Sequence, residues 1–212
     1  METIAVVDYN LGNLHSVSKA VEHVAPDARV LVTDDHAQIA QADRVVFPGQ
    51  GAARDCMKAI SDHHVEAAVR EAAEVKPFLG ICMGLQVLME YSDENGGTPL
   101  LDLFPGQVRH FARGRVDDNG VPLKIPHMGW SQVNQAIDHP MWQGIDDQSR
   151  FYFVHSYYIV PDDESIVAAT TDYIDPFACA IASDNLFAVQ FHPEKSADAG
   201  LQLLKNFVNW KP

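Results

Sequence analysis

One cysteine stands between two glycines where a short apolar run gives way to a new element. The sequence there reads Gly-Ile-Cys-Met-Gly, with Cys82 at its centre and Gly80 and Gly84 two residues away on either side. This is the layout of a nucleophile elbow, a tight strand-to-helix turn that pushes one side chain outward and needs small neighbours. At the first turn of a helix, unpaired N–H groups and the helix dipole favour a thiolate. The alternative is a buried core cysteine, but the paired glycines favour a nucleophile.

A candidate base lies near the opposite end of the chain. Residues 186–191 have the pattern of a strand, and His192-Pro193-Glu194 follows directly. In extended backbone, residues two apart point the same way, and Pro193 favours extended geometry at His192. Glu194 can therefore orient one ring nitrogen of His192, leaving the other to take a proton from Cys82. A surface histidine at a strand end is the alternative interpretation, and the elbow makes the catalytic one stronger.

The segments around these residues resemble a known family. Gly-Ile-Cys-Met-Gly-Leu-Gln at 80–86 and Gln-Phe-His-Pro-Glu-Lys-Ser at 190–196 are similar to the class I, triad-type glutamine amidotransferases. Further motifs at 8–14, 48–51, 126–130 and 153–158 resemble the branch of that family that serves histidine biosynthesis. The resemblance spans residues 8 to 196. It implies that Cys82, His192 and Glu194 hydrolyse glutamine to glutamate and ammonia through a thioester.

Hydrolysis of an amide also needs donors for the developing oxyanion. One donor is expected to be the amide of Met83, the residue after the nucleophile. The loop Pro-Gly-Gln-Gly at 48–51 follows a neighbouring strand at its carboxyl end, where α/β sheets place their sites. The resemblance implies the Gln50 N–H as second donor, with Gly49 and Gly51 beside the substrate. A plain strand-to-helix turn would also suit this loop.

Substrate recognition is visible mainly through the resemblance. It places four more residues around the bound glutamine, namely Gln86, Glu94, Ser156 and Tyr157. Glu94 would pair with the α-ammonium group, and the backbone of residues 156–157 would bind the α-carboxylate. Taken alone, Glu94 has the setting of a solvated loop charge and Tyr157 that of a core residue.

A partner is implied because no segment is left over to bind an ammonia acceptor. The resemblance identifies that partner as a (β/α)₈ barrel cyclase, which would make imidazole glycerol phosphate and an aminoimidazole carboxamide ribotide. An exposed group of Trp, Met and His suits an interface, although a buried turn with Trp130 in the core is the usual alternative. The expected partner-facing residues are Asn13, Pro126, His127, Met128, Gly129, Trp130 and Lys195.

The composition of the chain argues against several other kinds of protein. The 212 residues carry a net charge of −14, which argues against a nucleic-acid partner. Three cysteines form no disulfide framework, and a catalytic thiol requires a reducing compartment, so we expect a cytoplasmic protein. No apolar run is long enough to cross a membrane, and no basic leader precedes the first strand. No cofactor is implied, and the ten histidines show no zinc-type spacing.

The elements that must position these residues follow an α/β pattern over one domain, residues 1–212. Strands are predicted at 4–7, 29–32 and 44–47, with helices after each, so the first half should form a parallel sheet covered on both faces. We also expect a helix to continue past the elbow through Leu85, Leu88 and Met89. From residue 107 onward, short strands at 151–154, 157–160, 166–170, 178–182 and 186–191 suggest antiparallel meanders. A helix at 198–210 closes the chain with Leu201, Leu204, Phe207 and Val208 inward.

Two other functions remain open at this point. The chain could be the glutaminase of another synthase, such as anthranilate, GMP or pyridoxal phosphate synthase, although motifs 8–14 and 126–130 argue against this. It could also be a non-catalytic relative with Cys82 as a sensor, although a sensor needs no oriented base. Two departures from the family pattern stand out. Gln50 is polar where relatives have a small apolar residue, and Ser131 replaces their Asn.

Overall fold

The first half of the chain alternates strands and helices, as predicted. The computed structural model describes residues 1–112, 114, 116 and 124–212. The sequence Asp-Asp-Asn-Gly at 117–120 predicts a turn, which lies outside the described residues. In chain order the elements are β1 (Thr3–Val7), α1 (Leu14–Val24), β2 (Arg29–Thr33), α2 (His36–Gln41), β3 (Arg44–Gly49), α3 (Ala53–Asp62), α4 (Glu66–Val75) and β4 (Phe78–Cys82).

The second half is rich in short strands. Its helical elements are α5 (Met83–Gln86), η1 (Glu94–Gly96), η2 (Pro140–Trp142), η3 (Glu164–Ile166), η4 (Pro193–Lys195) and α6 (Ala197–Asn209). Its strands are β5 (Met89–Ser92), β6 (Thr98–Pro99), β7 (Phe104–His110), β8 (His127–Gln132), β9 (Asn134–Gln135), β10 (Arg150–His155), β11 (Tyr157–Pro161), β12 (Val167–Asp172), β13 (Pro176–Ser183) and β14 (Leu186–Val189).

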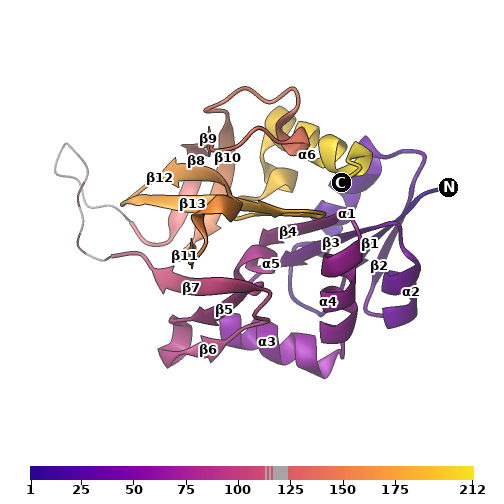
Figure 1. Cartoon of the computed structure of the whole chain (residues 1–212), viewed down its shortest axis with the longest axis horizontal. Helices are drawn as coiled ribbons and strands as arrows, with labels where there is room; N and C mark the ends of the chain where they lie inside the picture. The colour runs from indigo at the N-terminus through magenta and orange to yellow at the C-terminus, as the bar shows by residue number, and fades with distance from the viewer. Residues whose placement is uncertain (113, 115, 117–123) are drawn as a thin grey trace.

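One large mixed sheet runs through the described part of the molecule, in the order β2-β1-β3-β4-β14-β13-β11-β7-β5-β6. The strands from β2 to β14 are mutually parallel, and antiparallel pairing begins at β13. β12 pairs with β13, while β8 and β10 form a separate antiparallel pair (Figure 1). The predicted fold class is therefore confirmed: a mostly parallel central sheet, flanked by helices, with an antiparallel extension.

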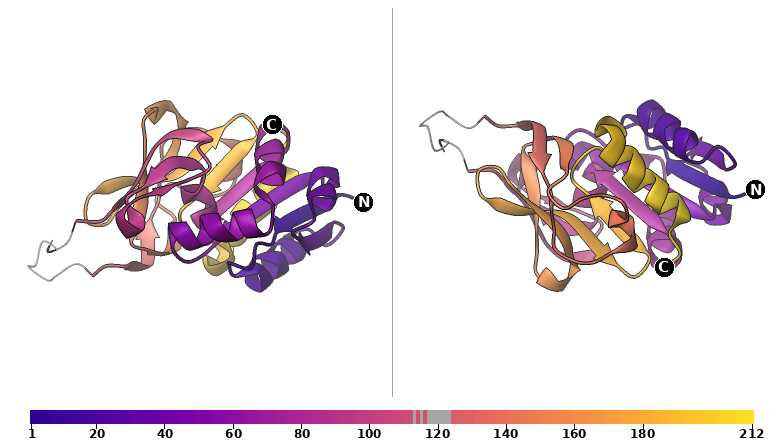
Figure 2. Two further views of the ribbon diagram at one scale, coloured as in Figure 1. Left: turned by 90° about the horizontal axis from the view of Figure 1, so that it is seen from below. Right: turned by 90° about the horizontal axis from the view of Figure 1, so that it is seen from above.

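The parallel strands at the centre of the sheet are buried on both faces, and the core is divided into one cluster on each face. On β1, Ile4 and Val6 belong to one cluster and Ala5 and Val7 to the other, as the two-residue period of a strand requires. The first cluster includes the buried faces of α1 and α6, and the second those of α2, α3 and α4. Helices thus cover both faces, as Figure 2 shows from below and from above.

The parallel strands bring three distant segments to one edge of the sheet. Gly49 at the end of β3 pairs with Cys82 at the end of β4, and Ile81 pairs with Val189 at the end of β14. The segments that leave these strands therefore meet at the carboxyl edge, which is where open α/β sheets bind their ligands.

Both ends of the described chain lie near the amino ends of the parallel strands, opposite the carboxyl ends where the segments above meet. Arg44, the first residue of β3, is buried, and its Nε donates to Glu2 Oε1 at 2.6 Å. Its Nη1 donates to the carbonyls of Phe207 at 3.0 Å and Trp210 at 2.5 Å. The Arg44 guanidinium thus donates hydrogen bonds to carbonyls at the end of α6, where the regular helical hydrogen bonds stop, and links them to Glu2, just before β1.

Two sequence-based expectations are wrong in detail. The helix after the elbow is a single turn, because Leu88 donates to the carbonyl of Leu85 and Met89 already begins strand β5. The apolar spacing that suggested a longer helix instead reflects a fully buried segment. In α6, Leu203 is buried where Leu201 was expected, while Leu204 and Phe207 face inward as predicted.

Candidate active site

Cys82 occupies a strained turn between β4 and α5. Its φ of 56° and ψ of −109° lie in a region that L-residues seldom adopt. A side chain on Gly84 would place its Cβ 1.8 Å from the Phe47 carbonyl oxygen, and one on Gly80 would lie 2.8 Å from Ala188 Cβ. The two glycines therefore allow neighbouring strands to pass close to the turn, which is the elbow geometry expected from the sequence.

His192 lies at the same edge of the sheet, just beyond β14. Its Nδ1 is 2.9 Å from Glu194 Oε1, and both side chains are buried. Burial alone would lower the pKa of the His192 imidazole, but interactions with Cys82 and Glu194 outweigh it and raise that pKa to about 10. Nε2 has no hydrogen-bond partner of ordinary geometry among the described residues. The ring therefore has one oriented nitrogen and one nitrogen available to a reacting group.

A thiolate at Cys82 would be stabilised mainly by the imidazolium of His192. The predicted helix-dipole contribution is small because α5 is only one turn long. Sequence reasoning missed a further contact, from Gln190 Nε2 to Cys82 Sγ at 3.7 Å. Gln190 is fully buried and stands two residues before His192. The same two-residue spacing that singled out Glu194 could therefore have identified it.

The expected oxyanion loop lies against the elbow. Gly49 is enclosed, since a Cβ there would sit 2.1 Å from Tyr9 Oη and 2.8 Å from Met83 Cβ. The Cys56 thiol of α3 donates to the Gln50 carbonyl at 3.3 Å. Met83 is the first residue of α5, so the helix ladder does not use its N–H. Cys56 and Tyr9 support this loop and were not singled out from sequence.

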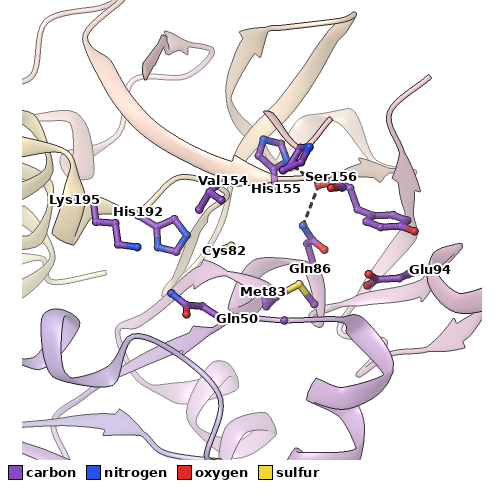
Figure 3. Close-up of a pocket in the computed structure, with 13 residues that line it drawn as sticks. Gln50, Cys82, Met83, Gln86, Glu94, Val154, His155, Ser156, His192 and Lys195 are labelled. Atoms are coloured by element: carbon purple, nitrogen blue, oxygen red, sulfur yellow. Dashed lines mark hydrogen bonds between the residues drawn. The ribbon is translucent and has the colours of Figure 1, made fainter. Parts of the chain in front are cut away.

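A pocket of about 400 Å³ opens over the elbow (Figure 3). Its lining includes most of the residues that were predicted for catalysis and substrate binding, together with Val154 and His155, which were not. The predicted lining residues are Gln50, Gly51, Cys82, Met83, Gln86, Glu94, Ser156, Tyr157 and His192. Two residues predicted for catalysis or substrate binding do not line the pocket: Glu194 contacts His192 instead, and Gly49 is enclosed by Tyr9 and Met83. A pocket of this size suits a small polar ligand.

Two of the predicted substrate residues also have structural contacts. Glu94 Oε2 accepts a hydrogen bond from the Ala53 N–H at 2.6 Å, at the start of α3. Gln86 Nε2 donates to the Tyr157 carbonyl at 3.0 Å and to Gln190 Oε1 at 2.9 Å. Gln86 therefore ties the segment after β10 to the segment after β14, and it fixes the pocket wall even without a ligand.

The expected partner-facing residues do not all lie on the surface. Met128 and Trp130 are 62% and 43% exposed, so Trp130 is not the core residue of the alternative interpretation. Pro126 and the exposed Lys195 line the rim of the pocket. His127 is a correction: it is only 2% exposed, because its ring stacks between Tyr173 and Phe153.

Asn13 begins α1 without a side-chain capping bond. Its loop lies beside the oxyanion loop, since a Cβ on Gly12 would be 3.7 Å from Gly49 Cα. Within residues 1–112, 114, 116 and 124–212, no cluster of His, Cys, Asp and Glu could hold a metal ion. None of the helices in that part of the chain is long and apolar enough to cross a membrane.

Comparison with known proteins identifies the family to which this chain belongs. A family model for the class-I glutamine amidotransferases matches residues 5–210. The chain belongs to the class-I glutamine amidotransferase family. It is 58% identical over 210 residues to the imidazole glycerol phosphate synthase subunit HisH of Thiobacillus denitrificans, covering 99% of this chain and 92% of that protein. It is 55% identical over 213 residues to the HisH subunit of Methylococcus capsulatus, covering 100% and 98%. Within the class, the chain is a member of this HisH family, as the motifs at 8–14 and 126–130 indicated.

Solved structures support the fold independently. One chain of PurLQS from Thermotoga maritima superposes with a TM-score of 0.70 at 16% identity, over 98% of both chains. A glutamine amidotransferase from the same organism gives a TM-score of 0.61 at 15% identity, over 93% of this chain and 78% of the other. At such low identity the likeness concerns the fold alone.

Proposed function

We propose that Cys82, His192 and Glu194 form the triad that hydrolyses glutamine in this amidotransferase. The observation that supports this most directly is that Cys82 and His192 line one pocket while Glu194 contacts His192. Cys82 is at the strained elbow, and the oriented His192–Glu194 pair lies beside it with a strongly raised imidazole pKa. Such pKa shifts mark sites where a charge is required for reaction.

The reaction divides into two steps of covalent catalysis. The Cys82 thiolate attacks the side-chain carbonyl carbon of glutamine. The C–N bond then breaks, and the nitrogen leaves as ammonia with a proton from His192 Nε2. Water, deprotonated by the same nitrogen, attacks the thioester, which releases glutamate and restores the thiolate. The N–H groups of Met83 and Gln50 would bind the oxyanion in both steps.

Recognition of the amino acid would come from the opposite wall of the pocket. Glu94 carries the negative charge that a substrate α-ammonium needs, and the Ser156–Tyr157 backbone would receive the α-carboxylate. Gln86 holds this backbone through the Tyr157 carbonyl. Gly49 and Gly51, on either side of Gln50, would lie beside the reacting amide of glutamine. Glutamine would therefore lie across the pocket, with its amide at Cys82.

Released ammonia would be consumed by a partner subunit. In neutral water ammonia is protonated and loses its nucleophilicity, so a second protein must cover the pocket. We infer a (β/α)₈ barrel cyclase that makes imidazole glycerol phosphate, docked on the face that carries Trp130, Met128, Pro126, Lys195 and Asn13. We also propose that the complex works in the cytoplasm, where a thiolate stays reduced.

The direct test is a glutaminase assay of Cys82→Ala with the barrel subunit present. Loss of the nucleophile should lower kcat at least ~10³-fold, whereas Cys179→Ala should stay within about twofold because Cys179 is buried in β13, away from the pocket. Glutamate release would be measured by a coupled enzymatic assay. An active Cys82→Ala protein would refute the proposed nucleophile. A wild-type protein that releases no glutamate with any partner would refute the proposal and favour the sensor interpretation.

A further inference from the structure

Two buried histidines outside the proposed triad contact one another below the surface of strand β8. His127 of β8 and His155 of β10 are opposite each other in the antiparallel pair. Their rings are joined by a hydrogen bond of 3.0 Å between His127 Nδ1 and His155 Nε2. Neither residue is needed for the triad chemistry, and two adjacent buried imidazoles carry a desolvation cost that calls for a reason.

The hydrogen-bond partners at the two ends of the pair decide which nitrogens carry protons. His155 Nδ1 lies 2.7 Å from the Tyr157 carbonyl oxygen, which can only accept, so this nitrogen must donate. His155 Nε2 is then the acceptor, and His127 Nδ1 must donate to it. His127 Nε2 accepts in turn, and Ser131 Oγ, 2.8 Å away, supplies the proton. Each group therefore donates to the next along one line: Ser131 to His127, His127 to His155, and His155 to the Tyr157 carbonyl.

Both imidazoles stay neutral in this arrangement. Burial lowers the pKa of His127 to about 4 and, as the largest effect, that of His155 to about 3. The His127 ring is also fixed between Tyr173, at 3.9 Å, and Phe153, at 4.9 Å, with nearly parallel planes. Neutral rings held by stacking keep one tautomer, so the direction of the chain of bonds is stable.

The chain of hydrogen bonds ends at the wall of the pocket. The Tyr157 carbonyl that accepts from His155 also accepts from Gln86 Nε2 at 3.0 Å. Gln86 Nε2 contacts Gln190 Oε1 at 2.9 Å, and Gln190 Nε2 lies 3.7 Å from Cys82 Sγ. Polar contacts therefore run without a break from Ser131, next to the exposed Trp130, to the sulfur at the elbow. Figure 3 shows His155 and Gln86 on either side of the Ser156 backbone.

We propose that His127 and His155 are positioning residues that set the backbone of Ser156 and Tyr157 to receive the substrate's α-carboxylate. This inference rests on the proposed function, because it assigns the histidines to the glutamine-binding wall of the same pocket. A weakened bond from His155 loosens the Tyr157–Tyr158 peptide, whose carbonyl it holds, and with it the adjoining backbone of Ser156 and Tyr157. This weakens ground-state and transition-state binding alike. Loss of such uniform binding raises KM and leaves kcat nearly unchanged.

The test compares His127→Phe with wild type in steady-state glutamine kinetics, with the barrel subunit saturating. Phenylalanine keeps the stacking on Tyr173 but removes the donor to His155. We expect KM to rise about tenfold and kcat to stay within about twofold. His139→Phe, which alters a half-buried histidine at η2, is the matched control and should leave both constants unchanged. An unchanged KM, or a fall in kcat alone, would overturn the proposal.

If His127→Phe folds poorly, two variants of Ser131 test the positioning role of the histidines instead. Ser131→Ala removes the donor to His127 Nε2 and should raise KM about threefold, since a single neutral hydrogen bond is weakened. Ser131→Asn offers an amide N–H in its place and should return KM to within about twofold of wild type, which a purely structural role would not require. Equal KM values for alanine, asparagine and wild type would refute the proposal.

The rate at which iodoacetamide alkylates Cys82 distinguishes a failure of this inference from a failure of the proposed function. The reagent has no α-carboxylate, so its rate should be unchanged in His127→Phe if the histidines act only on substrate binding. A large fall in the alkylation rate would show that they act on the thiolate instead, and would refute the positioning role. Activity that persists in Cys82→Ala would refute the proposed function itself.

Discussion

At the scale of single residues, the site depends on the coupling of one sulfur with one imidazole. Burial of His192 opposes its charged form, and the raised pKa shows that Cys82 and Glu194 together outweigh that effect. Glu194 orients Nδ1 at 2.9 Å, which leaves Nε2 toward the pocket. His192 is therefore held as an imidazolium, with one nitrogen oriented by Glu194 and the other available to a reacting group.

This coupling predicts a change in the titration of His192 when the sulfur is replaced. In Cys82→Ser, the hydroxyl does not ionise near neutral pH, so only Glu194 remains to oppose burial. The pKa of His192 should fall well below its value of about 10 in the wild type. Titration of ¹⁵N-labelled histidine followed by NMR would measure it. An unchanged pKa in Cys82→Ser would show that Glu194 alone holds the proton.

The residues that sequence reasoning found share one property: each belongs to a short local motif whose spacing carries the chemistry. Cys82 between two glycines, and His192 two residues before Glu194, are of this kind. Gln190 was missed although it obeys the same two-residue rule. His127 was wrongly placed on the surface, because its burial depends on Tyr173 and Phe153, which belong to other segments of the chain. No local pattern reports such contacts.

At the scale of elements, the elbow works because strand β3 passes close to helix α5. Gly84 lies against the Phe47 carbonyl, and Gly49 lies against Met83. Residues 186–191 were expected in antiparallel meanders, so the parallel pairing of β14 with β4 was missed. The parallel pairing of β3 with β4 was predictable from the alternation of strands and helices in the first half. The single-turn length of α5 was not, because buried apolar residues look alike in a helix and in the turn that follows one.

The close packing at the elbow predicts a large cost for a methyl group at Gly84. In Gly84→Ala, the new Cβ would lie 1.8 Å from a backbone oxygen that cannot move aside, so we expect a loss of at least about 3 kcal/mol in the free energy of unfolding. Urea denaturation followed by circular dichroism would measure it.

The control for that experiment is Gly96→Ala. Its Cβ would meet open space, and only the backbone φ of 79° is unfavourable. A loss of about 1 kcal/mol is expected there. Similar losses in the two variants would contradict the view that β3 is pressed against the elbow.

At the scale of the whole molecule, stability should depend on pH through the buried histidines. His127 and His155 remain neutral when folded because their pKa values are lowered to about 4 and about 3, but in the unfolded chain they take up protons below about pH 6.5. Protonation therefore favours unfolding as the pH falls from 6.5 toward 4. Well below pH 6.5, His192 does not make the free energy of unfolding depend on pH, because it is charged in both the folded and the unfolded chain.

Urea unfolding at a series of pH values between 7 and 4.5 would measure this effect. Each neutral buried histidine contributes a slope of up to about 1.4 kcal/mol per pH unit below 6.5. The wild-type protein should lose stability steadily on acidification, and His127→Phe should lose it less steeply. Parallel curves for the two proteins would mean that His127 is charged in the folded state.

The antiparallel half of the molecule shows where prediction from one sequence stops. The strands from β10 to β14 were predicted near their observed bounds, but β7, β8 and β9 were not. The pairing of β8 with β10, apart from the main sheet, was not predicted either. That pairing joins residues 127–132 to residues 150–155, and it creates the contact between the two histidines. The pairing of strands that are far apart in the sequence depends on how whole strands pack, so it cannot be predicted from the spacing of neighbouring residues.

The guanidinium of Arg44 gathers Glu2 and the carbonyls of Phe207 and Trp210 at the amino edge of the parallel strands. The pocket opens at the carboxyl ends of these strands, so both ends of the described chain lie on the opposite side of the sheet from it. Figure 1 marks these two ends near β1 and α1. An immobilisation handle attached before Glu2 or after Trp210 would therefore anchor the protein to a sensor chip with its ligand-facing side toward the flowing solution.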